Sequence, residues 1–210
     1  MGFLISQSLV NGIILGTLYL LMSIGFTLVF GIMRVVNFAH GEFYMLGAFA
    51  AFFMVTLFQL PYVVALGLSF GGAIFLGAVI ERIVFRPFRG DELSGMIASI
   101  GLAMILQNLA LIAFSPDPMA MPSLASGAFR FGFLIVPKSR LLALGASAGI
   151  LSLFYLFLMY TRTGRALRAL VQDQEIAAAY GVRIELMYPL GFGLGVGLAA
   201  IAGAMMAPLF

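Results

Sequence analysis

The chain has 210 residues, of which 63% are apolar and only 9% are charged, and its mean hydropathy is +1.14. Soluble globular domains carry about 25% charged residues, so this composition excludes a soluble monomer and indicates an integral membrane protein. There is no cysteine and the formal net charge is +3. These values exclude disulfide and zinc–thiolate chemistry and make the charge a signal of membrane topology rather than of nucleic-acid binding.

Six stretches of the chain are apolar and close to the roughly 20 residues that a transmembrane helix needs. In chain order they are expected at about 9–33, 43–60, 62–80, 94–114, 141–160 and 186–210. The first residues, MGFLISQSLVNG, have no basic region and no small-residue cleavage site, so no removable signal peptide is predicted. We therefore predict a single all-α domain over 1–210, a polytopic bundle of about six spans. Because the chain ends at Phe210 inside an apolar run, we expect a C-terminal truncation.

The first two spans are joined by a polar patch, NFAHGE, at 37–42. Asn37 can cap the helix that follows, and Glu42 near its start complements the helix dipole. Alternatively, the patch is a broken helix that borders a substrate path, since interrupted helices and intramembrane polar groups mark such routes. A lone His40 cannot form a metal site and is read first as a hydrogen-bonded structural residue near a membrane face. Asn37, His40 and Glu42 are the candidate path residues.

Other polar or small residues inside the spans have simpler interpretations. Gln107 and Asn108 are expected to bond between helices, because amides in lipid need partners; lining a pore is the alternative. Glycines spaced four apart are expected to let helices approach closely: Gly12 and Gly16, Gly67 and Gly71, Gly191 and Gly195, Gly193 and Gly197. The G-x-S-x-G match around Ser147 lies in a predicted span far from a histidine base, so it is read as packing rather than as a hydrolase site. No catalytic, cofactor or metal residue is predicted.

The segment 115–139 interrupts the helical pattern with four prolines, two glycines and the run FRFGFLIV. Proline opposes a helix here. We expect an ordered, irregular loop over the bilayer surface that includes a short hairpin.

The segment 161–185, TRTGRALRALVQDQEIAAAYGVRIE, is the longest charged stretch compatible with a helix. A short helix is predicted to start at Thr163 or Gly164 and to end at a left-handed Gly181. Its apolar stripe faces the membrane and its basic face points away. The stripe is Ala166, Leu167, Leu170 and Val171, and the outer face is Arg165, Arg168 and Gln172. This arrangement favours docking to a soluble domain over a merely solvated loop. Asp173 and Glu175 could pair with basic groups of that domain.

Alternating the six spans puts the segments 34–42, 81–92 and 161–185 on one side of the membrane. These segments hold 8 of the 11 Lys and Arg residues. Cytoplasmic loops collect Lys and Arg, so this side is predicted to be cytoplasmic. The N-terminus and the loop 115–139 are then outside.

Four blocks together resemble the permease of branched-chain amino acid ABC importers and cover essentially the whole chain. The blocks are LVNGIILGTLYLLMSIGFTLVFGIMRVVNFAHGEFYMLGA, ERIVFRPFRG, SIGLAMILQNLAL and TGRALRALVQDQEIAAAYGV. Within the last block, EIAAAYG is similar to the importers' EAA-x-x-x-G pattern, with Ile176 at a position that is usually Ala and without the downstream Leu-Pro. Family members continue through further spans beyond the point that matches Phe210.

The resemblance implies a multi-pass subunit of the bacterial inner membrane, and the Lys and Arg bias then places its N-terminus in the periplasm. Implied partners are the lipid bilayer, a second homologous permease, two cytoplasmic ATPases that bind ATP, and a periplasmic binding protein. No cofactor is implied on this chain, which is expected to be a transport subunit and not an enzyme. The ATPase-coupling residues would be Gly164, Arg165, Arg168, Asp173, Glu175, Ala177 and Gly181. The binding-protein contacts would be Phe129, Arg130 and Phe131, in the periplasmic loop. Urea or short-chain amide transport in the same family, or a self-sufficient channel or secondary transporter, are the alternatives.

Overall fold

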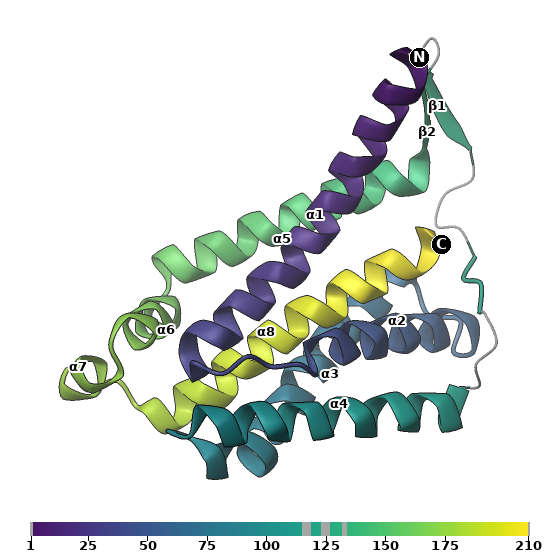
Figure 1. The fold of residues 1–210 in the computed structure, drawn as a ribbon. Coiled ribbons are helices and arrows are strands. Elements are labelled where there is room, and N and C mark those ends of the chain that lie inside the picture. The colour runs from purple at the N-terminus through teal and green to yellow at the C-terminus, as the bar shows by residue number, and fades with distance from the viewer. Residues whose placement is uncertain (1, 115–118, 123–126, 132–133, 210) are drawn as a thin grey trace.

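The computed structural model describes residues 2–114, 119–122, 127–131 and 134–209. The elements are α1 (Gly2–Met33), α2 (His40–Thr56), α3 (Tyr62–Ile80), the π-helical turn η1 (Glu81–Phe85), the 3-10 turn η2 (Arg86–Phe88), α4 (Glu92–Phe114), β1 (Ala128–Phe131), β2 (Leu134–Pro137), α5 (Lys138–Tyr160), α6 (Arg162–Gln172), α7 (Gln174–Ala179), α8 (Ile184–Met206) and the 3-10 turn η3 (Ala207–Leu209). The predicted all-α polytopic bundle is confirmed (Figure 1).

Five helices of the described chain are long and apolar enough to cross a membrane. They cover 5–33, 62–88, 92–114, 138–160 and 184–209. The remaining predicted span is α2, which has 17 residues and is therefore about 26 Å long at 1.5 Å per residue. The six expected apolar helices are thus present, and α2 is the short one.

Helix α8 is the centre of the bundle and packs against α1, α2 and α3 (Figure 1). Its glycines make this possible, because a Cβ on Gly195 or Gly193 would run into the backbone of α1 at Gly25 or of α3 at Ile74. The expected close approach is confirmed for Gly191, Gly193, Gly195 and Gly197. It is wrong for Gly12, Gly16, Gly67 and Gly71, where an added Cβ would meet no atom within 4 Å, because these faces of α1 and α3 have no neighbouring helix within the described chain.

The predicted hairpin lies at the end of the bundle opposite α6 and α7 (Figure 1). Strands β1 and β2 pair antiparallel, with Phe129 opposite Val136. Two bonds hold this end against the first turns of α1: the Gln7 side chain donates to Ile135 O at 2.9 Å, and Arg140 donates to Asn11 Oδ1 at 2.6 Å.

Candidate translocation and coupling sites

The connection between α1 and α2 runs along the bundle with Val35, Asn37 and Ala39 buried, while the Phe38 side chain is 54% exposed. Helix α1 ends at Met33 and the chain turns at Arg34, whose φ is 56°. The Phe38 N–H then donates to Ser99 Oγ at 3.1 Å, and the same hydroxyl lies 3.3 Å from Val36 O. Ser99 is seven residues into α4, or about 10 Å from its start.

Helix α2 consequently begins deep in the bundle, part-way along α1 (Figure 1). His40 Nε2 lies 3.3 Å from Met22 O, and Met22 is eleven residues before the end of α1, or about 16 Å. The prediction that His40 lies near a membrane face is therefore wrong. Six extended residues reach about 20 Å, which explains how so short a connection goes so deep. Irregular backbone at this depth is tolerated only where it is buried in protein or lines a cavity.

Asn37 and His40 lie together where the extended segment turns into α2. The Asn37 side-chain oxygen accepts the Ala39 N–H at 3.1 Å, and its backbone carbonyl accepts the His40 N–H at 3.1 Å. Asn37 thus forms a turn ahead of α2 and not the predicted cap, since α2 has no side-chain cap bond. The two side chains are 2% and 3% exposed. Asn37 Nδ2 and His40 Nδ1 are buried without a hydrogen-bond partner.

Both residues line a groove of about 460 Å³ against the C-terminal half of α1. The rest of the lining comes from Met22, Ser23, Phe26 and Thr27 of α1, and from Val36, Phe38 and Gly41. The lining therefore contains no charged side chain, and the His40 ring meets Phe26 edge-on at 5.5 Å.

Glu42 is directed to a different neighbour from Asn37 and His40. Its Oε1 accepts a bond from Gln107 Nε2 of α4 at 2.7 Å, and Glu42 is not part of the groove lining. Gln107 thus bonds between helices, as predicted, and Glu42 stands in the first turn of α2 as expected. The same prediction is wrong for Asn108, whose side chain donates to Met104 O in its own helix at 2.7 Å.

A connected set of polar contacts joins the C-terminal end of α1 to η1, to Arg89 after η2, and to α7 and α8. Arg89 donates to the fully buried Glu81 and stacks over Tyr188 at 4.1 Å. The Tyr188 hydroxyl donates to Gln174 Oε1 at 2.8 Å, and Gln174 Nε2 donates to Ile32 O at 2.9 Å. We call these five residues the relay.

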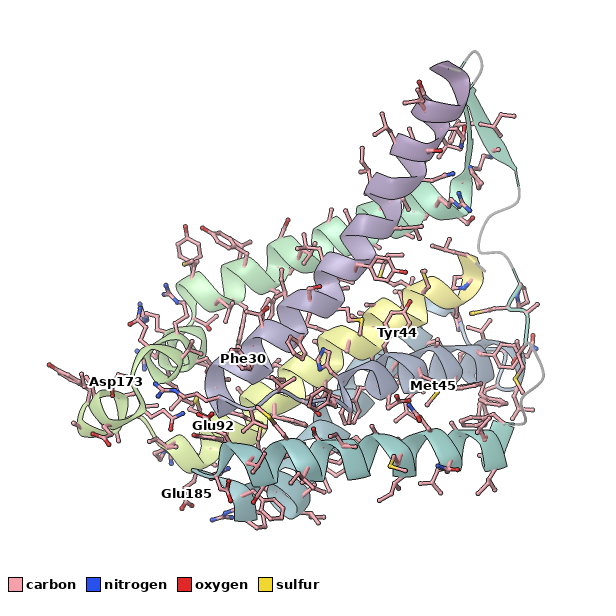
Figure 2. The ribbon with its side chains drawn as sticks, in the orientation of Figure 1. Phe30, Tyr44, Met45, Glu92, Asp173 and Glu185 are labelled. Carbon is pink, nitrogen blue, oxygen red and sulfur yellow. The ribbon has the colours of Figure 1, made fainter. Side chains whose placement is uncertain are left out.

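The same end gathers the charged segments that were predicted to share one side. Arg86 pairs with Glu185 at 3.5 Å, and Figure 2 shows Glu92, Asp173 and Glu185 at this end. Hydrogen bonds from the Ser94 hydroxyl and backbone N–H lower the pKa of Asp91, ahead of α4. The segments 81–92 and 161–185 therefore lie at the same end of the bundle as Arg34. The segment 37–42 lies farther from that end, part-way along α1.

The segment 161–185 forms two helices where one was predicted. The first begins at Arg162 because the Thr161 hydroxyl accepts the Gly164 N–H at 2.9 Å. Asp173 then leaves the helical region, with φ −156°, and its Oδ1 accepts the Ile176 N–H at 2.9 Å, which starts α7. A carboxylate that satisfies a free N–H at a helix start explains the break. Gly181 follows with φ +85°, the left-handed conformation that was predicted.

The predicted coupling residues divide into buried and exposed groups. Gly164 and Ala177 are buried, and a Cβ on Gly164 would collide with the α5 backbone at Phe157 and Leu158. The exposed members are Arg165, Arg168, Glu175 and Gly181, and Asp173 is half-buried between the two groups. Of the predicted apolar stripe, Leu167 and Leu170 are buried, whereas Val171 is 37% exposed.

Two apolar residues of this surface were missed from sequence. Ile176 is 57% exposed and Tyr180 is 87% exposed, both on or next to α7. Their signal was visible, since each is a large apolar residue inside an otherwise polar stretch.

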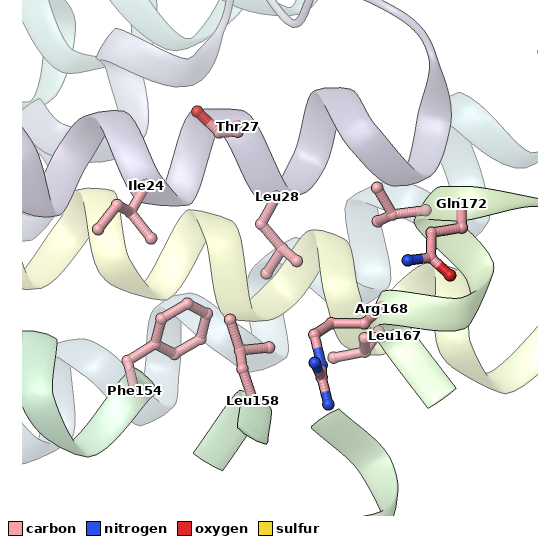
Figure 3. Close-up of a pocket in the computed structure, with 9 residues that line it drawn as sticks. Ile24, Thr27, Leu28, Phe154, Leu158, Leu167, Arg168 and Gln172 are labelled. Carbon is pink, nitrogen blue, oxygen red and sulfur yellow. The ribbon is translucent and has the colours of Figure 1, made fainter. Parts of the chain in front are cut away.

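A second groove, of about 350 Å³, lies between α1, α5 and α6 (Figure 3). Its walls are mainly apolar, with Leu28 of α1 facing Leu158 of α5 and Leu167 of α6. Arg168 and Gln172 form its polar edge. At this second groove the basic face of α6 lies beside the C-terminal half of α1. The groove lined by Asn37 and His40 lies against the same half of α1.

The hairpin and the serine motif complete the predicted sites. Phe129 is 47% exposed and has the Lys138 ammonium 5.5 Å from its ring centre. The Arg130 and Phe131 side chains lie outside the described part of the structure, although their backbones pair with Ile135 and Leu134. Ser147 is fully buried and bonds to Thr17 at 3.1 Å, as the packing interpretation predicts.

Comparison with known proteins gives a consistent set of relatives. The chain matches the family described as "Branched-chain amino acid transport system / permease component" over residues 8–210. It is 33% identical to the high-affinity branched-chain amino acid transport system permease protein BraD of Pseudomonas aeruginosa, over 95% of this chain and 70% of that protein. It is 31% identical to LivH of Escherichia coli K12, over 97% and 71%, and 28% identical to a probable LivH of Methanocaldococcus jannaschii, over 93% and 64%. No solved structure matches the chain.

Proposed function

The chain belongs to the branched-chain amino acid transport permease family, and from this premise we propose that it is the membrane subunit of an ATP-driven importer. Its substrates are leucine, isoleucine and valine, and its site of action is the bacterial inner membrane. It provides the translocation path by alternating access. ATP is hydrolysed on two cytoplasmic ATPase partners. A second homologous permease and a periplasmic binding protein complete the assembly.

One observation carries this proposal: an interrupted span lies between two differently built ends. At one end the paired helices α6 and α7 present Arg165, Arg168 and Glu175 outward. At the other end stands the β1–β2 hairpin with the exposed Phe129. Between them the α1–α2 connection breaks the helical pattern at membrane depth, where broken helices border substrate routes.

The first end suits an ATPase that pushes on the membrane domain. Helix α6 is anchored by Leu167 and Leu170, which are 1% and 0% exposed, so a force on its outer face reaches α1 and α5 directly. The predicted coupling residues then have two roles: the exposed ones contact the ATPase, and Gly164 and Ala177 let the segment seat closely. The orientation follows from the Lys and Arg bias, which makes this end cytoplasmic and the N-terminus periplasmic.

Asn37, His40 and Glu42 are the proposed path residues. Asn37 and His40 face the groove beside α1. Glu42 acts from the α4 side, where it holds Gln107. Phe129, Arg130 and Phe131 are the proposed contacts of the binding protein.

The test is transport by the reconstituted assembly. The chain is co-expressed with the other subunits of its transport system and placed in proteoliposomes with ATP inside or outside. We expect uptake of labelled leucine only when ATP is on the side of α6 and α7. Uptake of labelled urea without leucine would assign the related amide-transport function, and leucine flux without ATP or ATPase subunits would assign a channel.

A further inference from the structure

Two residues that line the groove beside α1 each have a buried side-chain nitrogen whose hydrogen-bonding capacity is unused. Asn37 Nδ2 and His40 Nδ1 have no partner, and both residues line the groove. Leaving a buried polar atom unpaired is unfavourable, and such atoms in folded proteins point to a missing water, ion or ligand. The groove of about 460 Å³ is large enough for a small organic molecule.

The two nitrogens have opposite chemical roles. The Asn37 oxygen already accepts from Ala39, so the free amide nitrogen can only donate. A carbonyl can only accept, so the His40 Nε2 that faces Met22 O carries the hydrogen. No charged side chain lines the groove to favour the imidazolium, and in the neutral ring Nδ1 is then an acceptor. The two buried nitrogens thus offer one donor and one acceptor.

The start of α2 adds a partial positive charge at the same place. Helix α2 has 17 residues and begins at His40, and the N-terminal end of a helix favours negative groups. The remaining groove walls include Met22, Phe26, Val36 and Phe38, which suit an apolar side chain. The combined preference is for a small molecule with an anionic acceptor, a cationic donor and an apolar part.

We propose that Asn37, His40 and the N-terminal end of α2 form a binding subsite for the carboxylate and ammonium of an α-amino acid in transit. The carboxylate accepts from Asn37 Nδ2 and the ammonium donates to His40 Nδ1. This inference rests on the proposed function and specifies its substrate contacts. A urea or a carboxamide has the same pairing of acceptor oxygen and donor N–H, so the experiment includes both substrates.

Two variants remove the free nitrogens and keep the local structure. Asn37→Ser retains a short side-chain oxygen for the Ala39 N–H and loses the amide nitrogen. His40→Phe retains a ring for the edge contact with Phe26 and loses the Nδ1 lone pair. Each is expected to lower leucine uptake by the reconstituted assembly about tenfold, as for one lost hydrogen bond to a charged group. Because His40→Phe also loses the Nε2 contact with Met22 O, the Tm criterion applies to Asn37→Ser, whose Tm should equal or exceed that of the wild type, since an unpaired buried atom has been removed.

The matched control is Asn108→Leu, an amide in α4 that bonds within its own helix and should leave uptake unchanged. Wild-type uptake by both test variants would overturn the proposal. A Tm of Asn37→Ser that falls in parallel with its uptake would also overturn it, because the amide nitrogen would then be structural. If the wild type carries urea and not leucine, the proposed substrate fails, and a tenfold loss of urea uptake in both variants would still support the subsite. A wild type that carries neither overturns both proposals.

Discussion

Adjacent residues of α4 show how far a polar side chain can be interpreted from sequence. Gln107 and Asn108 both carry amides at membrane depth, and both were predicted to bond to another helix. Only Gln107 does so, because it faces Glu42, while Asn108 turns back to Met104. Successive residues of a helix point about 100° apart, so the need for a partner can be predicted but its identity depends on which face meets a neighbour.

The glycines follow the same logic. Their four-residue spacing correctly predicts close helix packing in α8, where Gly193 approaches Ile74 of α3 and Gly195 approaches Gly25 of α1. The identical spacing at Gly12 and Gly16 leads to open space. Spacing identifies a smooth helix face, and only the fold shows whether a helix from this chain covers it.

Substitution of Gly47 should test the packing of α2 on α8. A Cβ on Gly47 would overlap the backbone of Ala200, which cannot move without displacing α8. Gly47→Ala is expected to cost about 1–3 kcal/mol by overpacking, measured as a lower Tm in detergent. Gly12→Ala is the matched control, because an added methyl group there meets no atom within 4 Å. Equal Tm values for the two variants would contradict the observed α2–α8 approach.

The coupling segment shows what helix signals predict and what they miss. Apolar spacing correctly predicted that Leu167 and Leu170 are buried, and Gly181 correctly marked the end. The break at Asp173 was missed, because an aspartate inside a helical pattern is compatible with either a surface charge or a new helix start. The contact that decides between them is local: its carboxylate accepts the Ile176 N–H.

Asp173 should act through the start of α7 more than through its charge. Asp173→Ala removes the oxygen that accepts the Ile176 N–H, which typically costs 0.5–2 kcal/mol, and should weaken binding of the ATPase by loosening α7. Asp173→Asn keeps a capping oxygen and removes the charge, so binding should stay within about twofold of the wild type. Affinity is measured by titrating the purified ATPase onto the permease in nanodiscs. A loss with Asn as large as with Ala would show that the charge itself meets the partner.

Tyr180 should be an anchor of the same docking surface. It is 87% exposed in a stretch that cannot enter lipid, and buried tyrosines dominate many interfaces. Tyr180→Ala is expected to cost about 2 kcal/mol of ATPase binding, roughly a thirtyfold weaker Kd. Tyr155→Ala is the control: this tyrosine is 57% exposed on α5, five residues before the helix ends, and should face lipid. Unchanged ATPase affinity in Tyr180→Ala would remove α7 from the docking surface.

The arrangement of the whole chain was predictable from charge, whereas the interrupted span was only one of two interpretations of the polar patch 37–42. The Lys and Arg bias correctly grouped 81–92 with 161–185, as the Arg86–Glu185 pair shows. The same alternation treated 34–42 as a surface connection, since a polar segment of this length can either cross a surface or enter a bundle. The contacts of Phe38 and His40 with α4 and α1 decide for the bundle. The sequence hints were the polar patch 37–42, which also fits a broken helix, and a second apolar stretch that is among the shortest.

The relay suggests how movement at α7 reaches the interrupted span. Gln174 is the only described residue of α7 whose side chain bonds to both α8 and α1, through the Tyr188 hydroxyl and Ile32 O. Ile32 O stands at the last turn of α1, two residues before the Arg34 turn that leads to Asn37. A shift of Gln174 therefore acts on the hinge of the segment that holds the groove.

Gln174→Leu should separate ATP hydrolysis from transport. The substitution leaves the outer faces of α6 and α7, the proposed ATPase contacts, unchanged. The affinity of the ATPase should therefore change by less than about twofold, while leucine uptake per ATP hydrolysed should fall about tenfold. Tyr188→Phe removes the other bond of Gln174 but keeps the ring under Arg89, so it should give a smaller loss of the same kind. Because both variants interrupt one connection, the double variant should be no worse than Gln174→Leu alone, a non-additivity typical of residues in one network. If the losses multiply in the double variant, the two residues act separately. If Gln174→Leu binds the ATPase more weakly, Gln174 supports ATPase docking and does not transmit movement from α7 to α1.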